Sequence, residues 1–328
     1  MKRLITPVAM SIALVLSSVA TSMAQGGADP LPSWNDGALK DRIVAWVDRV
    51  TDEANAEFVP VAERVAVFDI DGTLWAERPY YLDALFAADR VRELAADNPG
   101  WADQLPYAPI VAGDYDVLNS IASADFIRLI AASYGTSTDA EWEGVVEDWF
   151  DTSTNSVLGR VHASDTYLPM MELLELVKSR DFTPYLVTAA DEQFIRAVSD
   201  EIFGIPPEQV IGNELQLTVT DGEDGVTVTR TPVLATANER EGKVVQILDV
   251  VGRKPILAAG NSDGDYWMMK WTTTGDDDAL ALLVQHDDAT REFEYTRKPT
   301  LATAAVESDP EWAAVSIKDA WETVFAEQ

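Results

Sequence analysis

The fold is constrained most by a short segment in which two aspartates follow an apolar run. That run, Arg64–Phe68, is rich in strand-forming residues and predicts a buried parallel strand. Alternation along the chain puts Asp69 and Asp71 on one side, and Gly72 allows a sharp turn after them. A bare Asp-x-Asp before glycine also occurs in ordinary turns. Two carboxylates this close at a strand end need a cation or a retained proton, so the segment indicates chemistry.

The segment Asp69–Thr73 resembles the first motif of the haloacid dehalogenase superfamily. From about Trp34 onward the chain is similar to a phosphoserine-phosphatase-like subgroup of exported bacterial members. The resemblance implies an α/β fold, with a Rossmann-like parallel sheet core, helices on both faces and a helical cap inserted after the first strand. It also implies that Asp69 is the nucleophile of a phosphatase and Asp71 its general acid and base.

Two further positions match the superfamily's second and third motifs. Thr188 ends a predicted buried strand, 183–188, and a helix follows; a hydroxyl beside helix-start amides suits a phosphate group. Lys243 lies at the start of a predicted helix, where an ammonium would offset the charges of nucleophile and phosphate. Without the resemblance, Thr188 would be read as structural and Lys243 as a solvated surface residue. Ala189 and Ala190 replace glycines of close relatives, which could narrow the phosphate loop.

The fourth motif is represented by Gly260–Asp265, after a predicted strand at 255–259. Asn261 stands where many relatives have an aspartate, and Asp265 keeps the second acid. An asparagine oxygen can bind a hard cation but brings no charge. The resemblance therefore implies a Mg²⁺ site formed by Asp69, Asp71, Asn261 and Asp265, and Asp263 stays open as an alternative ligand.

Four regions follow from the pattern of strands and helices. We expect a signal peptide at 1–24, a first core part at 25–74, a helical cap at 75–167 and a second core part at 168–328. The last part includes a β-hairpin near 215–230, and the strand at 280–285 is expected to be the last of the core. If the cap is a lid, its helices pack mainly on one another and decide which substrates enter.

The N-terminus and the composition limit the partners. Lys2 and Arg3 precede an apolar run, and small residues before Gln25 fit cleavage after Ala24, so we expect a periplasmic or secreted protein. The formal charge is −32, and −32 − 2 = −34 without the leader, which disfavours nucleic acid and anionic membranes as partners. There is no cysteine, which excludes disulfides and cysteine nucleophiles. Of the two histidines, His286 lies near a strand end, and a structural role is expected for both.

The leading interpretation is an exported phosphatase that hydrolyses a small-molecule phosphomonoester through an aspartyl phosphate. A dehalogenase on the same fold is the first alternative; Asp71 argues against it, because halide departure needs no general acid. A periplasmic binding protein without activity is the second, suggested by Asn261 and the two alanines.

Overall fold

A seven-stranded sheet forms the centre of the molecule in a computed structural model that describes residues 28–135, 139–222, 225–275, 278–295 and 300–327. The predicted leader, 1–24, lies outside these residues. The strand order is β4-β3-β2-β1-β5-β6-β7, and all neighbours are parallel except β3 and β4. The strands are β1 Val65–Phe68, β2 Thr183–Asp191, β3 Val210–Gly222, β4 Gly225–Thr236, β5 Leu257–Gly260, β6 Leu280–Gln285 and β7 Trp312–Ser316.

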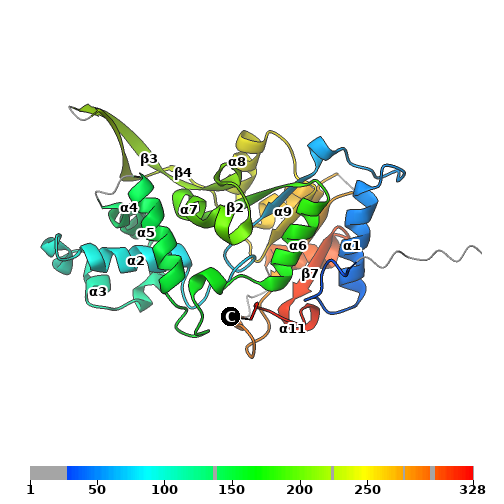
Figure 1. Ribbon diagram of the computed structural model, residues 1–328, viewed down its shortest axis with the longest axis horizontal. Coiled ribbons are helices and arrows are strands. Elements are labelled where there is room, and N and C mark those ends of the chain that lie inside the picture. The colour runs from blue at the N-terminus through cyan, green and yellow to red at the C-terminus, as the bar shows by residue number, and fades with distance from the viewer. Residues whose placement is uncertain (1–27, 136–138, 223–224, 276–277, 296–299, 328) are drawn as a thin grey trace, which may run out of the picture.

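Helices cover both faces of the sheet, as the alternation along β1 requires (Figure 1). Val65 and Val67 pack in a cluster with residues of α8 (Glu241–Val251), α9 (Tyr266–Thr273) and α10 (Leu301–Ser308). Ala66 and Phe68 point the other way, into a larger cluster with α1 (Ala38–Thr51), α6 (Leu168–Ser179) and α7 (Glu192–Phe203). A short α11 (Ile317–Ala320) follows β7. The predicted α/β class and parallel sheet core are confirmed.

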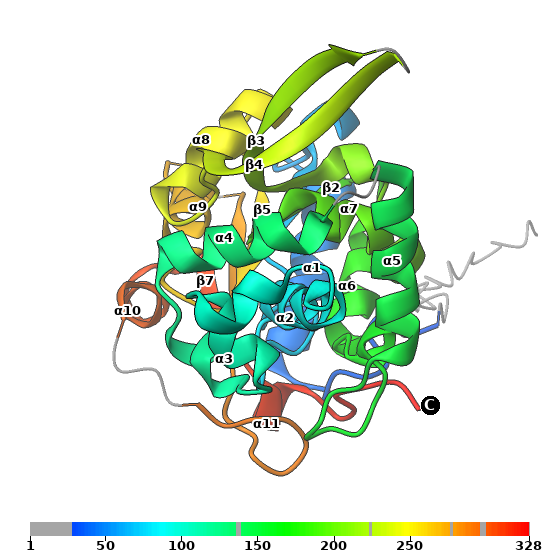
Figure 2. The same ribbon diagram turned by 90° about the vertical axis from the view of Figure 1, so that its left-hand side faces the viewer.

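Between β1 and α6 the described chain forms helices: α2 Leu82–Leu94, α3 Tyr107–Val111, α4 Ser123–Tyr134 and α5 Asp139–Thr152. Figure 2 looks onto this helical cap, with α4 crossing in front of the sheet. Its two linkers run side by side, since Ala76 N donates to Asp165 O and Tyr167 N donates to Leu74 O. The two hydrogen-bonded linkers therefore form one neck, through which the chain enters and leaves the cap.

The cap does not form a core of its own. The Phe86 and Phe150 rings, from α2 and α5, each lie 5.2 Å from the ring of Phe194 on α7. The Trp75 ring, on the outgoing linker, lies 5.3 Å from that of Phe203. These contacts join the cap to the larger apolar cluster of the sheet, so the cap helices pack on α7 as well as on one another.

Two strand predictions need correction. β3 begins at Val210, before the hairpin expected near 215–230, and β4 extends past 230 to Thr236; the hairpin projects beyond the rest of the sheet (Figure 1). The strand at 280–285 is not the last, because β7 pairs with it in parallel. β7 has only five residues and two of them are alanines, which are depleted in strands, so its local strand signal is weak. Among the described residues, no helix is long and apolar enough to cross a bilayer.

Candidate active site

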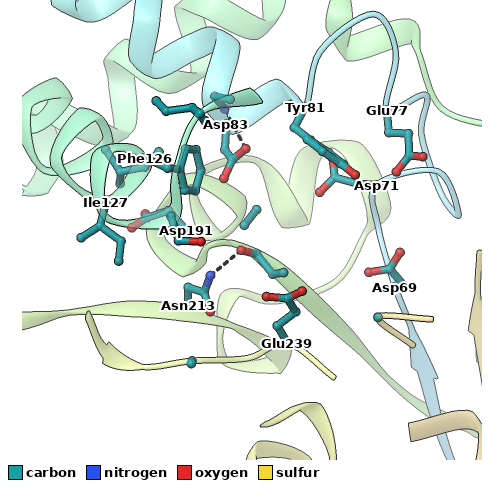
Figure 3. Close-up of a pocket in the computed structure, with 18 of the residues that line it drawn as sticks. Asp69, Asp71, Glu77, Tyr81, Asp83, Phe126, Ile127, Asp191, Asn213 and Glu239 are labelled. Atoms are coloured by element: carbon teal, nitrogen blue, oxygen red, sulfur yellow. Dashed lines mark hydrogen bonds between the residues drawn. The ribbon is translucent and has the colours of Figure 1, made fainter. Parts of the chain in front are cut away.

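The carboxyl ends of β1, β2 and β5 meet beneath the cap and enclose a cavity of about 440 Å³ (Figure 3). The parallel order explains the site, because β1 lies between β2 and β5 and all three end at one edge of the sheet. The lining includes five of the motif residues, with further acids from the cap neck, α2 and the end of β2: Asp69, Asp71, Lys243, Asn261, Asp265, Glu77, Asp83 and Asp191.

Lys243 joins two of the predicted acids. Its Nζ lies 2.6 Å from Asp69 Oδ1 and 2.7 Å from Asp265 Oδ1, and it also donates to Val187 O at 2.8 Å. Lys243 is 2% exposed, so the alternative of a solvated surface lysine is excluded. Burial alone would lower the pKa of Lys243, but the two carboxylates raise it above its ordinary value, and the ammonium stays charged.

The charges around Asp69 remain mostly negative, although Lys243 contacts its carboxylate. Burial, followed by the charge of Asp265, raises the pKa of Asp69 to about 7, while Lys243 opposes the shift. Its second oxygen, Oδ2, accepts a hydrogen bond from Thr73 Oγ1 at 3.2 Å. The lysine and the threonine together orient the carboxylate at the floor of the cavity.

Asp71 differs from Asp69 in its partners. The indole Nε1 of Trp75 donates to Asp71 Oδ1 at 2.8 Å, and no lysine contacts the carboxyl among the described residues. Burial and then the charge of Asp83 raise the pKa of Asp71 well above its ordinary value. A carboxyl that keeps its proton near neutral pH can donate it to a leaving group.

The fourth motif forms a tight loop around Asp265. Asp265 Oδ2 accepts from the backbone N–H groups of Asn261 and Ser262, both at 3.0 Å, while Oδ1 receives Lys243. Both oxygens of Asp265 are thus engaged within the protein. Asp263 accepts from Ala302 N at 3.0 Å and does not line the cavity.

Thr188, like Asp263, does not line the cavity. Its side chain is fully buried, and its Oγ1 accepts from Ala190 N at 3.0 Å. Ala189 and Ala190 line the cavity in its place. A contact between Thr188 and a phosphoryl oxygen stays a prediction.

The oxygen donors of the cavity suit a hard divalent cation whose remaining ligands are substrate oxygens and water. Among the described residues, no group of three His, Asp or Glu side chains forms a metal site on its own. Mg²⁺ commonly binds one or two carboxylates together with phosphate oxygens and water, which matches Asp69 and Asp71 beside an open cavity. The raised pKa of Asp69 gives the same indication, because a cation would stabilise the charged form that burial and the charge of Asp265 disfavour.

Four acids of the cavity were not predicted from the sequence: Glu77, Asp83, Asp191 and Glu239. Asp83 lies in the first turn of α2, and burial raises its pKa to about 7, with the charge of Asp191 adding to the shift. Asp191 is the N-cap of α7, accepting from the N–H groups of Gln193 and Phe194, and it also accepts from Tyr134 OH at 2.6 Å. Its N-cap pattern was readable in the sequence; its place in the cavity was not.

Comparisons with known proteins agree with this architecture. The family described as haloacid dehalogenase-like hydrolase matches residues 66–270, more than half of the chain. No curated protein matches.

Solved structures match at low identity, and the first two below have a similar fold. A conserved protein of unknown function from Anaerococcus prevotii DSM 20548 is 13% identical, with a TM-score of 0.52 over 84% of this chain and 91% of that one. A protein of unknown function from Bordetella pertussis Tohama I is 16% identical, with a TM-score of 0.51 over 77% and 98%. A phosphoserine phosphohydrolase-like protein from Francisella tularensis subsp. tularensis SCHU S4 is 12% identical, with a TM-score of 0.36 over 75% and 99%.

Proposed function

The chain belongs to the haloacid dehalogenase-like hydrolases, and we propose that it is a magnesium-dependent phosphatase that hydrolyses small phosphomonoesters. One observation carries the proposal: two aspartates of different character open onto one cavity. Asp69 is held by Lys243 as an oriented carboxylate, whereas Asp71 is set up to keep a proton. That division of roles is what in-line displacement of an alcohol from phosphorus requires.

The reaction proceeds in two displacements. An oxygen of Asp69 attacks phosphorus and forms a new P–O bond, the ester P–O bond breaks, and Asp71 gives its proton to the departing alkoxide. Asp71, now ionised, takes a proton from a water molecule, whose oxygen attacks the phosphorus of the aspartyl phosphate. The P–O bond to Asp69 breaks, inorganic phosphate leaves, and both carboxyls return to their starting state.

The site's cations support these steps in different ways. Lys243 neutralises Asp69 and Asp265 and keeps the attacking oxygen aligned. A Mg²⁺ ion held by Asp69, Asp71 and Asn261, with Asp265 behind them, would supply positive charge to the phosphoryl oxygens. Thr188 is proposed to contact the same phosphate from the end of β2.

The alternatives make different use of the same cavity. A dehalogenase needs the nucleophile but no proton donor, so the raised pKa of Asp71 favours phosphate ester cleavage over it. A binding protein would show no turnover at all. We also propose that residues 1–24 are cleaved and that the protein is periplasmic or secreted. The N-terminus supports this, because charged residues are followed there by an apolar run and then by small residues.

The test combines substrates, metal and two isosteric variants. The purified protein is assayed on a panel of phosphomonoesters with Mg²⁺ or with EDTA. Asp69→Asn abolishes turnover and keeps the fold, because the amide cannot attack phosphorus. Asp71→Asn still forms phosphoenzyme from esters with good leaving groups but hydrolyses it slowly. Phosphate trapped on a residue other than Asp69, or activity on haloacids alone, would refute the proposal.

A further inference from the structure

A buried chain of hydrogen bonds ends on the loop that carries the catalytic pair. His286 directly follows β6, and its Nε2 lies 2.8 Å from the carbonyl oxygen of Gly72. Since a carbonyl oxygen only accepts, Nε2 carries the proton of this contact. His286 is 7% exposed and does not line the catalytic cavity; it borders the site through the Gly72 carbonyl and through Asn261, whose Nδ2 lies 3.4 Å from His286 Nε2.

Gly72 leaves this loop little freedom to adjust. Its φ of +74° lies in the left-handed region, and a Cβ added there would come within 1.8 Å of Asn261 Nδ2. The Gly72 N–H is also taken, by Trp75 O at 2.8 Å. With its amide, its Cα and its carbonyl all in contact, Gly72 holds the backbone directly after Asp71 in one position.

The other side of His286 leads to the neck of the cap. His286 Nδ1 lies 3.1 Å from Glu292 Oε2, and Tyr167 OH donates to Glu292 Oε1 at 2.6 Å. Tyr167 belongs to the returning linker, where its N–H donates to Leu74 O. The path therefore runs from one cap linker, through two buried side chains, to the carbonyl of Gly72.

The outgoing linker reaches the same histidine by ring contacts. The Tyr295 ring stacks on the His286 ring at 4.3 Å between centroids and 17° between planes. Arg78 belongs to the outgoing linker, and its guanidinium lies over the Tyr295 ring, 4.8 Å from the ring centroid. Each linker thus reaches His286 through one intermediate side chain, Glu292 for the returning linker and Tyr295 for the outgoing one.

We propose that His286 is a positioning residue, which holds the Gly72 carbonyl and thereby aligns Asp71 for proton transfer, and which ties that alignment to the two linkers of the cap. The inference rests on the proposed phosphatase function. If the inference is right, substitution of His286 slows the proton transfers that use Asp71 more than it slows the attack of Asp69 on phosphorus.

Two substitutions separate the two contacts of the ring. In His286→Gln the amide nitrogen reaches the place of Nε2 and keeps the bond to Gly72, whereas in His286→Asn it reaches only the place of Nδ1 and keeps the bond to Glu292. Both remove the ring and its stacking equally. His162→Asn, at the other buried histidine, which pairs with Asp165 at 2.8 Å, is the matched control for loss of a buried imidazole.

The measurement compares an alkyl phosphate, which needs a proton donor, with an aryl phosphate, which does not. General acid catalysis is worth about 10²–10⁴-fold, so a misplaced Asp71 in His286→Asn is expected to lower alkyl ester turnover about 10- to 100-fold. The initial burst of aryl alcohol stays close to wild type, while phosphoenzyme accumulates. His286→Gln recovers most of the alkyl ester activity, and His162→Asn shows no dependence on the leaving group.

Tyr167→Phe, which removes one hydroxyl, is expected to give the same leaving-group dependence at a smaller size, and it carries the test if the histidine variants do not fold. A burst of aryl alcohol that falls as much as alkyl ester turnover, or recovery by Asn and not by Gln, would overturn the inference. A wild-type protein inactive on both esters would refute the proposed function first, and this inference with it.

Discussion

Lys243→Met tests the electrostatic centre of the site, because it removes the ammonium and keeps most of the side-chain volume. The change leaves Asp69 and Asp265 buried without their shared cation and leaves Val187 O without its donor. Removing one partner of a buried ion pair costs about 3–5 kcal/mol, since the remaining charge is uncompensated. For a chain of this size that loss lowers Tm by roughly 5–15 °C. Urea unfolding and calorimetry in EDTA measure both quantities.

The loss must also depend on pH. In the folded wild type the pKa of Asp69 is about 7, above its ordinary 3.8, so the folded state holds that proton more tightly than the unfolded state. The contribution to stability is complete below pH 3.8 and is lost as the pH rises through 7. Removing Lys243 raises this pKa further, so the variant's deficit is largest near pH 8 and smallest near pH 4.

Lys270→Met provides the control. Lys270 pairs with Asp309 at 2.9 Å, but it is 41% exposed, and such a pair contributes about 0–1 kcal/mol. The electrostatic reasoning would be refuted by either of two results. At pH 8 the loss of unfolding free energy in Lys243→Met could be as small as that in Lys270→Met, or the loss in Lys243→Met could be equal at pH 4 and pH 8.

Three other predictions concern metal, cap and export. EDTA should abolish activity, and added Mg²⁺ should restore it. Asn261→Asp should tighten Mg²⁺ binding in calorimetric titrations, because the substitution adds a charged oxygen ligand. Unchanged Mg²⁺ affinity would place Asn261 outside the metal's ligands. Phe126→Ala and Ile127→Ala, in α4 of the cap, should change the ranking of substrates by kcat/KM more than the rate on a small phosphate; a uniform loss would mean that the cap supplies a catalytic group. In a host with a general export system, mass spectrometry of the secreted protein should give Gln25 as the first residue, and retention of Met1 would contradict the leader.

The sequence could predict the half of the site that lies at strand ends. Asp69, Asp71, Asn261 and Asp265 follow short apolar runs, and a parallel sheet brings such positions to one edge. Lys243 was ambiguous, because a lysine in the first turn of a helix is usually solvated. Its burial follows from the position of α8 over β2 and β3, which no local pattern encodes.

The other half of the site depends on contacts between distant segments. Asp83 reaches the cavity because α2 packs on α7 through Phe86 and Phe194, and the sequence around Asp83 shows only an amphipathic helix. His286 was expected to be structural, and it contacts a residue 214 positions earlier in the chain.

Asp265 shows what motif matching leaves out of such a site. Its position predicts a metal ligand; the structure adds that its Oδ2 accepts two backbone amides of its own loop and that its Oδ1 pairs with Lys243. Backbone N–H groups occur at every non-proline residue, so a carboxylate held by them leaves no trace in residue types. The amides stabilise the charge of Asp265, and that charge in turn helps to raise the pKa of Asp69. The pKa of Asp69, the proposed nucleophile, therefore depends on a turn whose effect is visible only once the loop has folded.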